Sequence, residues 1–125
     1  MIKRAVVIVL LSILAMACKP GPPSPVYSTG EFRVTGAGSV THANIYYTAF
    51  GGSDQNVLYN VVLPWSHSFD VVQTGDGYFL AAQSNDDATV PADVLTIEVL
   101  VDAALVDTDF TNAAFGYVAL YGTVP

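Results

Sequence analysis

Val61-Val62-Leu63-Pro64-Trp65-Ser66-His67 is the stretch around which the predicted fold is organised. Pro64 cannot donate a hydrogen bond to a β-ladder and restrains Leu63 to extended geometry, so it belongs at the end of a strand. The stretch therefore predicts a corner that joins two strands. The residues before Pro64 show the two-residue period of a strand with one buried face, whose inward positions are Val57, Tyr59, Val61 and Leu63.

Trp65 follows the proline directly and is the only tryptophan of the chain. In a small sandwich, an indole at this place closes one end of the core. The alternative is an exposed indole that anchors a ligand, since tryptophan is also enriched at binding sites. We expect burial and keep Trp65 as a candidate binding residue.

Outward from the corner, short alternating runs recur along the chain, and no stretch keeps the apolar period of a long helix. This pattern predicts an all-β fold, a small immunoglobulin-like antiparallel β-sandwich of seven to eight strands. The most β-prone run, residues 94–101, is expected to be a central strand. The expected strands cover residues 31–35, 41–50, 57–63, 67–73, 78–84, 94–101, 105–110 and 114–123.

Three connections between these strands differ in how well their residues suit a turn. Gly51-Gly52-Ser53-Asp54 supplies glycine where positive φ is needed. Thr74-Gly75-Asp76-Gly77 is the clearest hairpin signal of the chain, and in the strand before it we expect Phe69 and Val71 to point inward. Asp102-Ala103-Ala104 lacks the glycine that a tight hairpin favours, so it is expected to turn poorly.

The last expected strand is apolar on both faces. Phe115, Tyr117 and Tyr121 share one face, and aliphatic residues share the other. One of the two faces is therefore covered by protein or left as an aromatic surface patch. On the second expected strand, Tyr46 lies on the polar face. The candidate binding residues are Trp65, Tyr46, Tyr117 and Tyr121.

The N-terminal residues predict export. Residues 1–17 have a basic start and an apolar run too short to span a membrane, and are expected to be a lipoprotein signal peptide. They lead into Leu14-Ala15-Met16-Ala17-Cys18, which resembles a bacterial lipobox, with Ala15 where leucine is more usual. Cys18 is the only cysteine, so we expect it to carry lipid; the alternative is an ordinary secretory signal with a chance cysteine.

The proline-rich residues after Cys18 predict an extended tether over residues 18–28, followed by a β-sandwich domain at 29–125. The several acyl chains of a mature bacterial lipoprotein would hold the domain at the membrane. Lys19 stands where, in enteric bacteria, aspartate marks retention in the inner membrane. We therefore expect a cell-envelope location, at the outer membrane or on the cell surface or periplasmic face.

Charge excludes one class of partner. After cleavage, two cations, Lys19 and Arg33, stand against eleven carboxylates, so the formal charge of the mature chain is −9. Nucleic acid is excluded, because phosphate binding needs clustered lysine and arginine. We interpret the acidity as a contribution to solubility, with cation recruitment as the alternative.

No residue pattern indicates catalysis, a metal site or a cofactor. Neighbours on a strand point to opposite faces, so Ser66, His67 and Asp70 do not form a hydrolase triad. His42 and His67 alone are too few for zinc. The acidic residues at 85–93 lack the spacing of a calcium loop and are expected to be solvated.

Four segments carry a family resemblance: Val34-Thr35-Gly36, Ile45-Tyr46-Tyr47, Val62-Leu63-Pro64-Trp65-Ser66 and Ile97-Glu98-Val99-Leu100-Val101-Asp102. In this order they resemble the MmpS family, small mycobacterial membrane proteins that accompany RND-type exporters of lipids and siderophores. The resemblance covers residues 30–123 and implies an extracytoplasmic β-sandwich. The chain departs from the family in its lipoprotein signal, its missing cysteine pair and its Asp102-Ala103 turn.

These observations lead to one functional hypothesis and two alternatives. The hypothesis is a non-enzymatic lipoprotein that presents its sandwich as an interaction module and, by resemblance, serves as a transport accessory. Its partners would be the membrane, through the lipid anchor, and an envelope transporter or another envelope protein. The alternatives are a surface module that binds a small ligand or a glycan, and a structural envelope protein.

Overall fold

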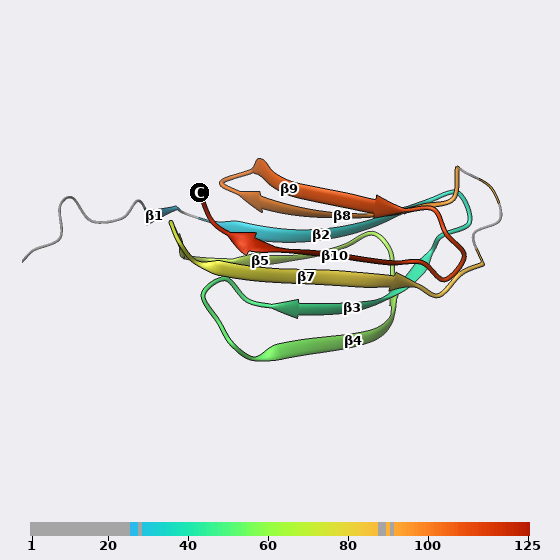
Figure 1. The fold of residues 1–125 in the computed structure, drawn as a ribbon, viewed down its shortest axis with the longest axis horizontal. Helices are drawn as coiled ribbons and strands as arrows, with labels where there is room; N and C mark the ends of the chain where they lie inside the picture. Colours follow the sequence, from blue (N-terminus) through green and yellow to red (C-terminus); the bar gives the residue numbers. More distant parts are fainter. Residues whose placement is uncertain (1–25, 28, 88–89, 91) are drawn as a thin grey trace, which may run out of the picture.

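The computed structural model describes residues 26–27, 29–87, 90 and 92–125, and these residues form strands joined by turns and loops (Figure 1). The predicted signal peptide, Cys18 and most of the predicted tether lie outside the described residues. The strands are β1 (Val26–Tyr27), β2 (Gly30–Ala37), β3 (His42–Thr48), β4 (Gln55–Val62), β5 (Trp65–Phe69), β6 (Val72–Gln73), β7 (Gly77–Ser84), β8 (Val94–Val101), β9 (Ala104–Thr111) and β10 (Tyr117–Thr123).

Two four-stranded antiparallel sheets form a sandwich (Figure 1). One sheet has the order β10-β7-β3-β4 and the other the order β5-β2-β8-β9, while β1 and β6 make a separate two-stranded sheet. The prediction of an all-β antiparallel sandwich, with eight strands in its two main sheets, is confirmed.

The strand order follows the immunoglobulin pattern over most of the fold. The order β10-β7-β3-β4 matches the G-F-C-C′ sheet of a variable domain, and β2 pairs with β5 as strand B pairs with strand E. The β8–β9 hairpin pairs with the other side of β2, at the place of strand A. Residues 94–101 are thus a central strand, as predicted, since β8 lies between β2 and β9.

The core lies between the two sheets and is built from alternate residues of their strands. Each fully buried leucine, isoleucine or phenylalanine stabilises the fold by about 1.5–3 kcal/mol relative to an exposed one. In β8, Leu95, Ile97, Val99 and Val101 are buried, and Leu100 is buried as well. The buried set includes Phe32, Val34, Ala43, Ile45, Leu80, Ala82, Leu95, Ile97, Val99, Val118 and Leu120.

The corner at Pro64 carries the chain from one sheet to the other. β4 ends at Val62 on the edge of one sheet, and β5 begins at Trp65 on the edge of the other. The Leu63–Pro64 peptide is cis, and the Leu63 N–H donates to the Thr41 carbonyl at 2.9 Å. The predicted corner is therefore confirmed.

The inward positions predicted for β4 are wrong at two residues. Val57 and Tyr59 are 39% and 74% exposed, while Leu58 packs against the core. The pairing of β4 with β3 shifts by one residue at a bulge, where Asn60 has a φ of 51°. An extra residue in one strand reverses the side of every position before it, so Val61 faces inward but Tyr59 does not.

The segment after β5 also differs from its prediction. Val71 is 65% exposed and Val72 is fully buried, because β5 ends at Phe69 and β6 begins a new alternation. The turn at residues 74–77 forms, and the Asp76 N–H donates to the Gln73 carbonyl at 3.0 Å. It is not a hairpin, however, since β6 pairs with β1 and β7 pairs with β10 and β3.

The expected poor turn between β8 and β9 is a tight two-residue hairpin. Val101 pairs with Ala104, and the two residues between them, Asp102 and Ala103, have φ of 48° and 64°. Positive φ at both central residues is the mark of a type I′ turn. Asp102 also joins this turn to Thr29, with two hydrogen bonds of 2.9 Å.

Two residues of the segment predicted as tether form a β-strand. Val26 and Tyr27 form β1, which pairs with Gln73 and Val72 of β6. The Tyr27 hydroxyl donates to the carbonyl of Pro125 at 3.1 Å, so the start and the end of the domain are joined.

Candidate functional site

Tyr59 of β4, which is 74% exposed, lies at the edge of the outer surface of the β10-β7-β3-β4 sheet, and four more aromatic side chains of this surface lie on the other three strands. Tyr46 of β3, Phe79 of β7, and Tyr117 and Tyr121 of β10 alternate with inward residues and therefore point outward. We call these four residues the aromatic face. The predicted outward position of Tyr46 is confirmed. Of the two outcomes expected for the last strand, an aromatic surface patch is the one found, because its aliphatic side chains are buried.

Strand register sets these side chains in rows across the sheet. Tyr121 pairs with Phe79, so two aromatic residues are direct cross-strand neighbours. Tyr117 pairs with Gln83, which in turn pairs with Asn44, so this tyrosine has two amide side chains in its row. Cross-strand neighbours on one face interact directly, so each row is a contact unit.

Between these two rows lies a third row, in which β10 and β7 carry alanine and β3 carries Tyr46. Ala119 pairs with Ala81, which pairs with Tyr46. Ala81 points outward yet is 0% exposed, so the larger side chains around it cover it. Tyr121 and Tyr117 are 79% and 56% exposed. The aromatic face is thus one continuous surface with two strongly exposed tyrosines.

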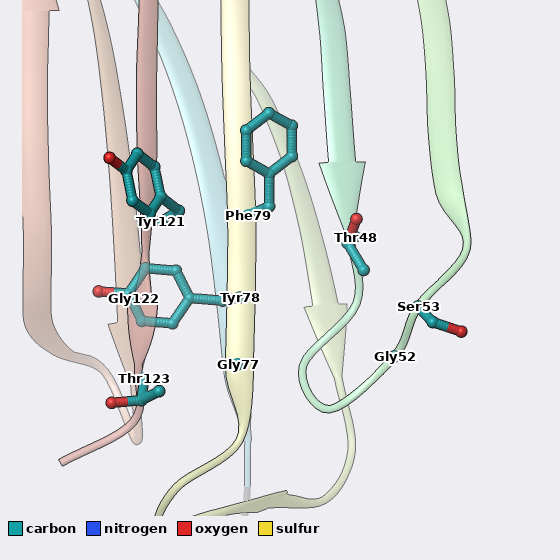
Figure 2. A pocket seen from close by; sticks show the side chains of 9 residues that line it. All are labelled: Thr48, Gly52, Ser53, Gly77, Tyr78, Phe79, Tyr121, Gly122 and Thr123. Carbon is teal, nitrogen blue, oxygen red and sulfur yellow. The ribbon is translucent and has the colours of Figure 1, made fainter.

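A shallow pocket of about 410 Å³ adjoins the aromatic face (Figure 2). Tyr121 and Phe79 lie side by side at one end of it, and the hydroxyl residues Thr48 and Ser53 lie across from them (Figure 2). Gly77 has no side chain to fill the base of the pocket. A Cβ at this position would meet only the Gly122 carbonyl oxygen, at 3.9 Å. The pocket is lined by Thr48, Gly52, Ser53, Gly77, Tyr78, Phe79, Tyr121, Gly122 and Thr123.

The sheet that carries the aromatic face has no charged residue. None of β3, β4, β7 and β10 contains Asp, Glu, Lys or Arg. The other sheet does: Arg33 donates to both carboxylate oxygens of Glu31, at 2.8 and 3.1 Å, and the bonds and charge of Glu31 raise the pKa of Arg33. The two outer surfaces therefore differ in chemistry, one charged and one aromatic and neutral.

An amide cluster borders the Tyr117 end of the aromatic face. Asn44 Oδ1 accepts from the Asn60 N–H at 2.9 Å and from Asn85 Nδ2 at 3.0 Å. Gln83 Nε2 donates to the Phe115 carbonyl at 3.3 Å. The cluster was not predicted, because its members are far apart in the chain and the β4 bulge brings Asn60 to Asn44. The signal that could have indicated the cluster is the presence of amide residues at outward positions of neighbouring strands.

Trp65 lies on the inner side of β5 and not on the aromatic face. It pairs with Val34, a buried core residue, and packs partly buried against the core. Its ring centroid lies 5.6 Å from that of Tyr47 and 6.2 Å from that of His67, to which it is nearly parallel. Trp65 therefore packs at the margin of the hydrophobic core and lies apart from the other three candidate residues.

The residues considered for catalysis are not brought together. Ser66 and His67 pair with an outward and an inward residue of β2, so their side chains lie on opposite sides of the sheet. Asp70 lies beyond the end of β5, and His42 belongs to the other sheet. Among the residues that the structure describes, no group of three or more His, Cys, Asp or Glu is placed to hold a metal ion.

Two carboxylates of the acidic loop before β8 bind backbone N–H groups. Asp86 Oδ2 accepts from the N–H of Thr41 at 2.8 Å and of His42 at 3.0 Å, and these bonds lower the pKa of Asp86 although burial opposes them. Asp93 accepts from the Ser39 N–H at 2.9 Å and is 4% exposed. The expectation of a solvated loop is therefore wrong for Asp93, which is a buried cap for the turn before β3.

No protein-family model matches the chain, and no curated protein matches it. The resemblance to the MmpS family stays a prediction. In the part of the chain that the structure describes, no helix has the length and apolar character needed to cross a membrane.

Proposed function

We propose that the chain is a non-enzymatic lipoprotein of the bacterial cell envelope, anchored through Cys18, and that the aromatic face of its β-sandwich binds a partner or ligand. One observation carries the proposal: a sheet without a single charged residue exposes Tyr121 by 79% and Tyr117 by 56% in a chain with eleven carboxylates. Exposed aromatic side chains with few charges around them are typical of binding surfaces.

The resemblance to the MmpS family gives this function a specific form, a transport accessory. The partner would then be a membrane-embedded exporter that the domain reaches from the membrane surface. A proline-rich tether extends by about 3.1 Å per residue, so residues 18–25 would hold the domain roughly 25 Å from the anchor. An accessory of this kind contacts the extracytoplasmic part of its partner through the aromatic face.

The anchor has its own test. The variant Cys18→Ser should move the protein from the membrane fraction to the soluble envelope fraction, because acyl chains on Cys18 are proposed to anchor it in the bilayer. Ser24→Ala, in the same segment, should leave the protein with the membranes. Membrane retention of Cys18→Ser would contradict the lipid anchor.

The contact surface is tested by capture from envelopes solubilised in mild detergent. The full chain, tagged after Pro125, should retain its partner, and Tyr117→Asp should lose it because the substitution places a charge on a neutral surface. Phe110→Asp is the matched control, since Phe110 is 61% exposed on the outer side of the other sheet. Equal capture by both variants would contradict the proposed surface, and recovery of an exporter with wild type would support the accessory role.

A further inference from the structure

We propose that the aromatic face binds an uncharged polysaccharide, and that the pocket beside Tyr121 holds one of its sugar rings. This inference rests on the proposed binding function and names the chemistry of the ligand. Four features support it: Tyr121 and Phe79 are cross-strand neighbours, two tyrosines are spaced along β10, amides lie beside them, and the sheet carries no charge.

The pocket matches the two kinds of surface that a sugar ring presents. A pyranose has a flat side of C–H groups, which packs on an aromatic ring, and a rim of hydroxyls, which needs hydrogen-bond partners. Tyr121 and Phe79 are direct neighbours across β10 and β7 and supply the apolar side. Thr48, across the pocket, carries a hydroxyl, whereas the Ser53 side chain points away from the two rings (Figure 2). A volume of about 410 Å³ lies in the range of small-ligand sites.

The spacing of the tyrosines favours a chain of sugars over a single sugar. Tyr117 and Tyr121 lie on the same side of β10, four residues apart, which corresponds to about 13 Å at the rise of a strand. One pyranose is too short to reach both rings. Ala119, between them, has a small side chain and leaves the path along β10 open. An oligosaccharide lying along the strand would contact both tyrosines.

The amide side chains supply polar contacts at the other end of this path. Gln83 and Asn44 lie in the same row as Tyr117. Asn44 Oδ1 already accepts two hydrogen bonds, so Asn44 offers its Nδ2–H groups as donors, while Gln83 Oε1 can accept from a sugar hydroxyl. Asn44 is already held by Asn60 and Asn85. Its position is therefore fixed before a ligand arrives, which lowers the entropic cost of binding.

The absence of charge from the sheet selects a neutral ligand. An acidic polysaccharide or a phosphate group would require lysine or arginine, and β3, β4, β7 and β10 contain neither. A basic protein partner would be drawn by carboxylates, and these strands contain none. Neutral hydroxyls are the groups that Tyr, Thr, Ser, Asn and Gln side chains bind without a countercharge.

Affinity electrophoresis of the full chain in detergent micelles tests this inference. The gels contain laminarin, galactomannan, dextran, or the neutral and acidic polysaccharide fractions of the cells that make the protein, separated by anion exchange. We expect at least one neutral polysaccharide to retard the wild-type protein and the acidic fraction to have no effect. No retardation by any neutral polysaccharide, or equal retardation by the acidic fraction, would overturn the inference.

Three variants locate the site. Tyr121→Ala removes a stacking ring, and Gly77→Leu fills the pocket at a position where a Cβ has no neighbour closer than 3.9 Å. Each should weaken binding about tenfold or more. Phe110→Ala removes an exposed ring from the other sheet and should bind as wild type does. Thermal unfolding of each variant shows that its fold is intact. Polysaccharide binding that neither Tyr121→Ala nor Gly77→Leu weakens would place the sugar elsewhere.

Different results would contradict the proposed contact surface and the proposed sugar ligand. Loss of envelope capture by Tyr117→Asp, together with no retardation by neutral polysaccharides, would overturn the sugar ligand and leave the contact surface standing. In that case a protein partner is the occupant. Unchanged capture and unchanged electrophoresis for every variant of the aromatic face would overturn both proposals.

Discussion

Ala103 holds a backbone conformation that glycine adopts more easily. Its φ is 64° and it occupies the second central position of the β8–β9 turn, where type I′ hairpins favour glycine. An L-residue with a side chain is strained in the left-handed region, and glycine is not. The variant Ala103→Gly should therefore raise the free energy of unfolding by about 0.5–1 kcal/mol, measured by urea denaturation.

The next residue supplies the control. Ala104 opens β9 and does not have a positive φ, so Ala104→Gly adds only chain entropy to the unfolded state. It should lower the free energy of unfolding by about 0.5–1 kcal/mol. A destabilising effect of Ala103→Gly, equal to that of Ala104→Gly, would contradict the strained turn.

At the residue scale, alternation predicts which side of a strand a residue occupies only while the register holds. It places Tyr46, Tyr117 and Tyr121 on the outside correctly, because β3 and β10 alternate regularly up to these residues. It fails at Val57 and Tyr59, because the bulge at Asn60 inserts a residue that no local signal marks. Asparagine tolerates positive φ, but many asparagines occur without a bulge.

At the element scale, a side-chain hydrogen bond between Tyr78 and Asp107 joins the two sheets. The hydroxyl of Tyr78, on β7, donates to Asp107 Oδ2, on β9, at 3.0 Å. Tyr78 is 7% exposed. Burial, followed by the hydrogen bond to Asp107 and its negative charge, raises the pKa of Tyr78 to about 12. The folded protein therefore holds the phenol in its neutral, donating form.

This link makes stability depend on alkaline pH. The folded-state pKa of Tyr78 lies above its ordinary value of 10.0, so its contribution is complete below about pH 10 and is lost as the pH rises toward 12. At pH 8, Tyr78→Phe should lower the free energy of unfolding by about 1–2 kcal/mol, because a partly buried carboxylate, Asp107, loses its donor. Denaturation at several pH values should show the difference between the two proteins shrinking above pH 10. A constant difference up to pH 12 would contradict the proposed role of the phenol.

The elements themselves were predictable where the signal was local. Residues 95–99 alternate strictly within the β-prone run 94–101, which has the same bounds as β8, and Pro64 ends a strand as its chemistry requires. The pairing of the strands, in contrast, was not predictable from local sequence. Residues 74–77 have the composition of a hairpin and do turn, but β7 finds its partners in β10 and β3, through contacts distant in sequence. A turn sequence fixes the path of the chain and not the partner of the strand that follows.

At the scale of the whole molecule, charge is divided between the two sheets. Five charged residues lie in β2, β8 and β9 and none in β3, β4, β7 and β10. The composition predicts an acidic domain, yet only the strand order shows that its neutral strands are neighbours. The tyrosines of the aromatic face could be named from the sequence. Phe79, the pocket and the amide cluster could not, since each depends on pairing between distant segments.

The most direct test of the aromatic face is photo-crosslinking in the cells that make the protein. Tyr121→p-benzoylphenylalanine places a crosslinker on the aromatic face, and Phe110→p-benzoylphenylalanine places one at an exposed aromatic position on the other sheet. Irradiation of intact cells should give a slower-migrating adduct from position 121 and none from position 110. Adducts of equal yield from both positions, or from position 110 alone, would contradict the account.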